Sequence, residues 1–196
     1  HHLLPLEEVA SLGRDFDFIH CHGVLHHLAS PEAGLQALAS VLRPHGAMSL
    51  MVYARYGRAG LYMLQDLSHR LGLGTTQETA TELQELCWLL PESHPFRGLG
   101  YKPGQKIELN EILDMLAHPR DVSYDVAGIK DLIEAGGVKM HRWLGQGQYT
   151  PTVGALRGSG VSLRVNALPF WERSAAMELL RGTIMMHSFV VTHPGR

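Results

Sequence analysis

Charged residues are scarce in this sequence, and the two signs nearly cancel. Asp, Glu, Lys and Arg make up 18% of the 196 residues, and the formal net charge is -2. A chain without excess positive charge has no electrostatic reason to bind nucleic acid or an anionic membrane surface. No apolar run is long enough to span a membrane, and no signal peptide is visible. The sequence therefore predicts neither a nucleic-acid nor a membrane partner.

Cysteine is also rare, with Cys21 and Cys87 the two in the sequence. Two cysteines, one at the end of an apolar run and one in a helical pattern, do not make a disulfide framework. Chains of this kind are typical of a reducing compartment, so we expect a cytoplasmic protein.

Histidine, by contrast, is frequent, and several histidines gather near one apolar run. The gathered residues are His20, His22, His26 and His27. Their spacing matches neither the H-E-x-x-H pattern nor a C-x-x-C pair, and no nearby carboxylate that could orient the rings is evident in the sequence. We therefore predict no metal site, and a metal hydrolase is the weakest functional alternative.

The segment 16–53 carries the clearest structural pattern. FDFIHC is an apolar run without alternation, as in a strand buried on both faces of a parallel sheet. Ser30 can cap a helix that begins at Pro31, with leucines at helical spacing behind it, and Pro44-His45-Gly46 ends this helix. AMSLMVY then begins a second buried strand. We expect parallel strands near 16–21 and 47–53, and open α/β sheets of this kind bind ligands at the carboxyl ends of their strands.

The same residues carry a family resemblance. FDFIHCHGVLHHLASPEAGLQALASVLRPHGAMSLMVY resembles the region of the fourth and fifth strands of class I S-adenosylmethionine-dependent methyltransferases. The family pattern is FD with two apolar residues, a polar turn, V-L-H-H-L, a helix and V-L-x-P-x-G. A looser likeness extends through residues 53–67 and 184–191. The resemblance implies an α/β, Rossmann-like methyltransferase sheet and S-adenosyl-L-methionine as cofactor.

Two parts of the family pattern are missing from the sequence. The glycine-rich turn E/D-x-G-x-G-x-G is absent, and so is the acidic residue that binds the ribose. By resemblance, the chain looks like the C-terminal part of a methyltransferase, truncated at the N-terminus. We therefore expect this chain alone to bind S-adenosylmethionine weakly or not at all, to be inactive or impaired, and to expose a sheet edge that can pair with another copy in a homo-oligomer.

The rest of the pattern predicts three parts. Residues 1–53 form a partial Rossmann-like core, 54–124 form a helical lid or substrate insertion, and 125–196 complete the core with an enlarged final hairpin. The leucine spacing predicts mainly helices over 58–117, covering the carboxyl ends of the strands. Asp125 can cap the next helix. Strands are expected near 138–144 and 184–192, with the last antiparallel to its neighbours.

The resemblance also implies which residues hold the cofactor. Leu3 and Leu4 correspond to the stretch beside the adenine, and Cys21, His22 and Gly23 correspond to the elbow that contacts the methionine part. Gly23 lets the backbone turn closely without a Cβ clash. The alternative is that the elbow is an ordinary turn between strand and helix.

Three residues are candidates for acid–base chemistry, although the sequence does not identify the catalytic residue. His26 and His27 stand in V-L-H-H-L, and Tyr53 ends the second strand. A histidine titrating near neutral pH suits proton removal from a nucleophile. The commoner role of such a histidine is a hydrogen bond to nearby backbone, and this alternative stays open.

Further polar residues follow the second strand and are candidates for binding the acceptor. They are Arg55, Tyr56, Arg58 and Tyr62. A tyrosine or arginine at the end of this strand can orient a substrate. The same residues are equally consistent with a polar loop leading into an amphipathic helix.

These observations favour methyl transfer from S-adenosylmethionine in the intact parent protein, to an acceptor that the sequence does not identify. Much of the catalysis would come from positioning the reactants. Two alternatives remain open at this point: a non-catalytic α/β binding module, and a nicotinamide-dependent oxidoreductase on a related sheet. Because both enzyme classes need a glycine-rich turn, its absence does not separate them.

Overall fold

The computed structural model describes residues 1–74, 76–102, 104–118, 120–151 and 156–194. The chain divides into two compact units. Residues 1–56 and 122–196 form the first, called here the sheet unit, and residues 57–121 form the second, called here the helical unit.

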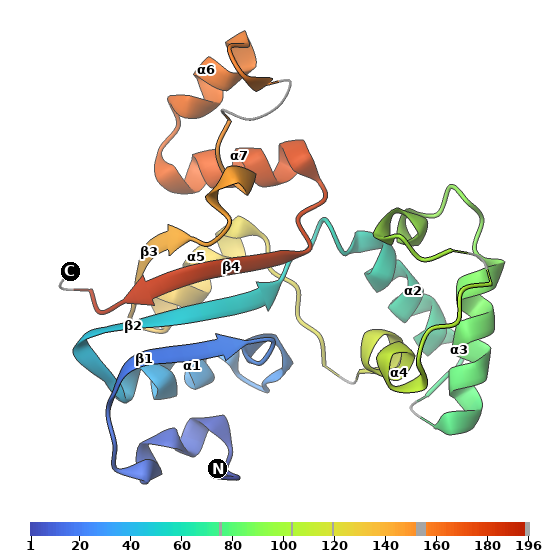
Figure 1. The fold of residues 1–196 in the computed structure, drawn as a ribbon, viewed down its shortest axis with the longest axis horizontal. Coiled ribbons are helices and arrows are strands. Elements are labelled where there is room, and N and C mark those ends of the chain that lie inside the picture. Colours follow the sequence, from blue (N-terminus) through green and yellow to red (C-terminus); the bar gives the residue numbers. More distant parts are fainter. Residues whose placement is uncertain (75, 103, 119, 152–155, 195–196) are drawn as a thin grey trace. The chain divides into compact units, whose positions relative to one another are not determined.

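The sheet unit is built on four strands (Figure 1). They are β1 (Phe16–His22), β2 (Leu42–Tyr53), β3 (Lys139–Trp143) and β4 (Met186–Thr192), in the order β1-β2-β4-β3. β1 and β2 are parallel, while β4 runs antiparallel to both β2 and β3. This confirms the mixed α/β sheet and the antiparallel last strand that the sequence predicts.

The start of β2 corrects one prediction. The strand begins at Leu42 rather than near residue 47, and it includes Pro44-His45-Gly46, which the sequence predicts as the end of the preceding helix; that helix ends at Ser40. The pairing moves from Phe16 with Leu42 to Phe18 with Ala47, so the additional residues of β2 bulge out. A Cβ on Gly46 would come within 2.9 Å of the Asp17 carbonyl oxygen, which explains the glycine at this close approach.

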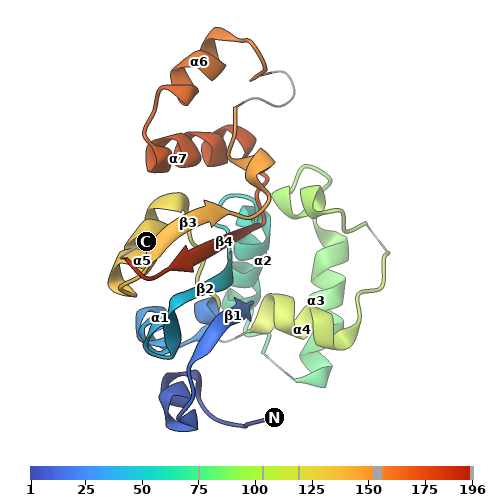
Figure 2. The ribbon, with the colours of Figure 1, turned by 60° about the vertical axis from the view of Figure 1, so that its left-hand side comes forward.

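Two capped helices cover one face of this sheet (Figures 1 and 2). α1 (Pro31–Ser40) begins where the Ser30 hydroxyl accepts a hydrogen bond from the Ala33 amide at 3.2 Å. α5 (Val126–Ala135) begins where Asp125 Oδ1 accepts from the Gly128 amide at 2.8 Å. Both caps agree with the sequence prediction, because a serine or aspartate oxygen satisfies an amide that the first helical turn leaves unpaired.

The core of the sheet unit lies between these helices and the sheet. On β2 the covered side chains are Met48, Leu50 and Val52, all fully buried. Leucines and isoleucines of α1 and α5 belong to the same hydrophobic cluster, as do Phe189 and Val191 of β4. Because alternate strand residues point to opposite faces, the intervening residues of β2 line the other face.

A long connection joins β3 to β4 and enlarges the final hairpin, as predicted. It contains η4 (Gln146–Gln148), α6 (Gly160–Asn166) and α7 (Phe170–Arg181). α7 packs on α5 and on Trp143, whose indole N–H donates to the Ser174 hydroxyl at 2.9 Å. The sequence did not indicate α6, nor the short 3-10 helices η1 (Leu6–Leu12) and η2 (Leu25–His27) in the first part of the chain.

The helical unit has its own core. It consists of α2 (Ala59–Arg70), α3 (Gln77–Leu89), η3 (Pro95–Leu99) and α4 (Leu109–Ala117), so the prediction of a mainly helical segment is confirmed. Its fully buried side chains include Leu64, Leu83, Phe96 and Leu116. The predicted covering of the strand ends stays a prediction. Within the described residues, no helix combines the length and apolarity needed to cross a bilayer.

Candidate functional site

The elbow at the carboxyl end of β1 has the backbone that the sequence predicts. Gly23 has φ +73°, and its amide donates to the Met51 carbonyl of β2 at 3.3 Å. A Cβ on Gly23 would find its nearest neighbour, Met51 Cε, at 3.8 Å, so space remains around the turn. The glycine is therefore required by its left-handed conformation rather than by crowding.

The two residues before this glycine are held in different ways. Cys21 is 5% exposed, and burial raises the pKa of its thiol to about 11, so the thiol is protonated near neutral pH. His22 is half-buried, and its Nε2 lies 2.8 Å from the hydroxyl of the buried Ser49 on β2. Burial, followed by the neighbouring His20, lowers the pKa of His22. The raised pKa of the Cys21 thiol and the lowered pKa of the His22 imidazole both favour the uncharged forms of these side chains.

Ser49 is a site residue that the sequence did not reveal. It lies on β2 directly opposite His20 in the β1–β2 register, and it is 6% exposed. Its only sequence signal is a hydroxyl within an apolar strand. Such a residue is often just a tolerated small side chain, so the signal does not identify a partner for His22.

The three acid–base candidates form one ring cluster, which we define as His26, His27 and Tyr53. The His26 ring centroid lies 4.0 Å from that of Tyr53 and 4.2 Å from that of His27, and the His27 and Tyr53 rings meet edge to face at 5.7 Å. His26 is completely buried, whereas His27 and Tyr53 are half-buried. His27 and Tyr53 are therefore partly exposed to solvent, whereas His26 is not.

The four candidates for acceptor binding belong to two different units. Arg55 and Tyr56 belong to the sheet unit, and Arg55 forms a 2.8 Å ion pair with Asp125. Arg58 and Tyr62 belong to the helical unit. Arg58 Nε donates to the Tyr62 hydroxyl at 3.3 Å, and the guanidinium carbon lies 5.8 Å from the centre of the Tyr62 ring.

Leu3 and Leu4, the predicted adenine contacts, lie before η1 at the start of the chain. Leu3 is fully exposed, and Leu4 is half-buried. A role at an adenine edge stays a prediction for both.

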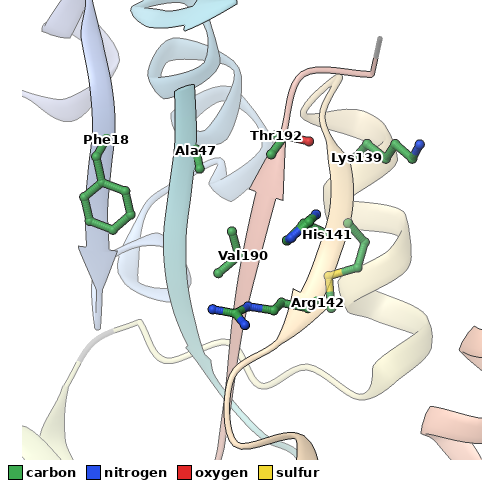
Figure 3. A pocket seen from close by; sticks show the side chains of 8 residues that line it. Phe18, Ala47, Lys139, His141, Arg142, Val190 and Thr192 are labelled. Atoms are coloured by element: carbon green, nitrogen blue, oxygen red, sulfur yellow. The ribbon is translucent and has the colours of Figure 1, made fainter. Parts of the chain in front are cut away.

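A hollow of about 620 Å³ lies on the sheet face that α1 and α5 leave uncovered (Figure 3). Phe18, Ala47, Val190 and Arg142 line it from all four strands, and Phe18 is 60% exposed. It lies toward the amino ends of β1 and β2. Ligands of open α/β sheets bind at the opposite, carboxyl ends, where the elbow and the ring cluster are. We therefore assign the candidate site to the carboxyl ends.

A family model and a curated relative both match this chain. Residues 2–94 match the family model of a methyltransferase domain. The chain is 32% identical over 195 residues to an uncharacterized protein, syc1184_c, of Synechococcus sp., covering 95% of this chain and 46% of that protein. The chain thus spans about half the length of this curated relative.

Solved structures agree with the fold. PKMT2 from Rickettsia typhi is 13% identical, with a TM-score of 0.71, and the match covers 98% of this chain and 38% of that chain. The structure of the same protein in complex with AdoHcy gives a TM-score of 0.73 and covers 98% of this chain and 39% of that one. At this identity the likeness concerns the fold.

Proposed function

Because this chain has the fold of class I S-adenosylmethionine-dependent methyltransferases and matches their domain over residues 2–94, we propose that it takes part in methyl transfer from S-adenosylmethionine to an acceptor. The elbow Cys21–Gly23 forms part of the cofactor site in this proposal. One observation carries it: at the carboxyl ends of β1 and β2, the left-handed Gly23 turn is hydrogen-bonded to Met51 of β2, the strand that ends at Tyr53 of the ring cluster.

The elbow fits such a cofactor in two respects. The glycine backbone is open, since no atom lies closer than 3.8 Å to the position of a Cβ. The buried Cys21 thiol stays protonated, so it offers a methyl-transferring sulfonium no competing thiolate nucleophile. The glycine-rich turn and the ribose-binding acid are not in this sequence, so the chain supplies only part of the binding contacts.

S-adenosylmethionine, when bound, supplies a methyl group activated by its sulfonium. The residues of this chain act on the acceptor in our proposal. His27 is the accessible imidazole of the ring cluster and takes the proton that a nucleophilic acceptor releases. Tyr53 orients the acceptor, while the buried His26 holds the Tyr53 ring in place through its 4.0 Å ring contact. Positioning and exclusion of water supply the remaining rate enhancement.

Two-dimensional NMR of the labelled chain, titrated with S-adenosylhomocysteine to millimolar concentration, tests the cofactor site. We expect weak, saturable shifts confined to the elbow, Met51 and Tyr53. NAD⁺ at equal concentration is the control ligand. No shift at the elbow at any concentration overturns the proposed cofactor site, and stronger shifts with NAD⁺ favour the oxidoreductase alternative.

A further inference from the structure

A fully buried polar network lies beside the candidate site. Tyr149 Oη lies 2.6 Å from His187 Nδ1, and His187 Nε2 lies 3.0 Å from Glu178 Oε1 and 3.1 Å from the carbonyl oxygen of Tyr124. His187 is 0%, Glu178 2% and Tyr149 3% exposed. The three side chains come from β4, α7 and the turn after β3, so the network links elements far apart in sequence.

The surroundings of His187 fix its protonated nitrogen. Nε2 faces two acceptors, the Glu178 carboxylate and the Tyr124 carbonyl, so it must carry a proton. The N–H is better aligned with the carbonyl than with Glu178 Oε1, which lacks a well-formed hydrogen bond among the described residues. The second carboxylate oxygen of Glu178 accepts from the Val126 amide at 2.9 Å, at the positive end of α5.

The network meets a short segment, residues 122–126, which we call the strap. Its amides and carbonyls form hydrogen bonds with η2 and with the carboxyl end of β2. The Val122 amide donates to the His26 carbonyl at 3.0 Å, the Tyr124 amide donates to the Tyr53 carbonyl at 2.9 Å, and the Tyr124 carbonyl accepts from the Arg55 amide at 2.8 Å. The strap therefore contacts the backbone of two members of the ring cluster.

We propose that Glu178 and His187, steadied by Tyr149, are positioning residues that hold the strap against the carboxyl end of β2 and thereby fix the ring cluster. Glu178 anchors the strap at Val126, and His187 anchors it at Tyr124. The proposal rests on the proposed function in one respect only, namely that the ring cluster belongs to the acceptor site. The anchoring itself is independent of any ligand.

The composition of the network supports positioning over simple core stability. A buried carboxylate and imidazole lose much of their hydration, and apolar side chains of similar size often stabilise a core as well or better. What a buried, hydrogen-bonded network adds is a unique geometry. Here the geometry is specific, because Nε2 reaches the same carbonyl that receives the Arg55 amide.

Amide hydrogen exchange measured by NMR tests the anchoring, with the variant Glu178→Gln and the control Ser174→Ala. Ser174 lies one turn earlier on α7, is also buried, and accepts from Trp143 outside the network. In Glu178→Gln the amides of Tyr124 and Arg55 should exchange about tenfold faster than in Ser174→Ala, and the Tyr53 signals should shift. An acceleration below threefold relative to the control overturns the proposal.

A second measurement needs no variant and remains decisive if Glu178→Gln fails to fold. Nitrogen chemical shifts of the imidazole in the native chain should show His187 protonated at Nε2, and a neutral ring protonated at Nδ1 overturns the proposal. Neither measurement uses cofactor. A failed S-adenosylhomocysteine titration with an intact network therefore overturns the proposed function alone, while normal exchange in Glu178→Gln overturns the positioning alone.

Discussion

Replacing Gly23 by alanine separates the conformational role of the elbow from its role in binding. Gly137 provides a matched control, because it also has a left-handed backbone, with φ +66° against +73° for Gly23. Neither site is crowded. Among the described residues, leaving out the chain neighbours of each glycine, the nearest atom to an added Cβ is Met51 Cε at 3.8 Å for Gly23, and no atom lies within 4 Å for Gly137. The two substitutions therefore differ mainly in location.

The expected change in unfolding free energy is similar at both positions. A left-handed conformation costs an L-residue about 1–2 kcal/mol. Alanine lowers the entropy of the unfolded chain, which offsets about 0.4–1 kcal/mol of this cost. We expect each variant to be destabilised by about 1 kcal/mol in urea unfolding, with an unchanged slope.

Binding should distinguish the two variants. Gly23→Ala should abolish the S-adenosylhomocysteine-induced NMR shifts at the elbow, whereas Gly137→Ala should preserve them. Equal loss of the shifts in both variants, at equal stability, would refute the assignment of the elbow to the cofactor site. A Gly23→Ala destabilisation of 3 kcal/mol or more would refute the reasoning that the turn is uncrowded.

Three further outcomes follow from local contacts. Asp125→Ala should destabilise the sheet unit by about 1–2 kcal/mol in urea unfolding, because it removes a helix cap and the exposed ion pair with Arg55. Asp125→Asn keeps the cap and should cost less than about 1 kcal/mol in the same assay. Gly60→Ala should disrupt the helical unit, seen as a loss of helical circular dichroism, because a Cβ would come within 2.2 Å of a backbone nitrogen. Burial raises the pKa of Cys21 and of Cys87 from 9.0 to about 11. The contribution of the two protonated thiols to the free energy of unfolding is therefore complete below pH 9 and is lost as the pH rises through 11, which should lower the urea midpoint. An unchanged midpoint up to pH 11 would contradict the burial of the thiols.

Features set by neighbouring residues could be predicted from the sequence. Ser30 before Pro31 and Asp125 before Val126 specify helix starts, because a cap oxygen needs only an amide three residues away. The apolar runs likewise predicted where β1 and β4 lie, but the prediction that β1 is buried on both faces is wrong: Cys21 is buried under the helices, whereas Phe18 on the uncovered face is 60% exposed. The leucine spacing predicted the helices of the helical unit, because burial of one helix face leaves apolar residues at helical spacing.

Features set by distant residues could not be predicted. The early start of β2 depends on pairing with Phe16, and it carries a proline that suggests a turn when the sequence is considered alone. The partner of His22 is 27 positions away, at Ser49. His187 and Tyr124 are 63 positions apart, and no local pattern marks either as a member of a network. Such contacts arise only when the sheet order brings the segments together.

The polar residues after β2 show the same limit for function. Arg55, Arg58 and Tyr62 were predicted to bind an acceptor because they follow a strand that ends at a ligand crevice. Each has an internal partner in the structure: Arg55 pairs with Asp125, and Arg58 contacts both Tyr62 and, at 3.7 Å, Asp121. An arginine or tyrosine that follows a strand can contact either a substrate or another residue of its own chain, so residue type and position do not tell the two roles apart. Only the distance to a carboxylate far along the chain, Asp125 for Arg55 and Asp121 for Arg58, distinguishes them.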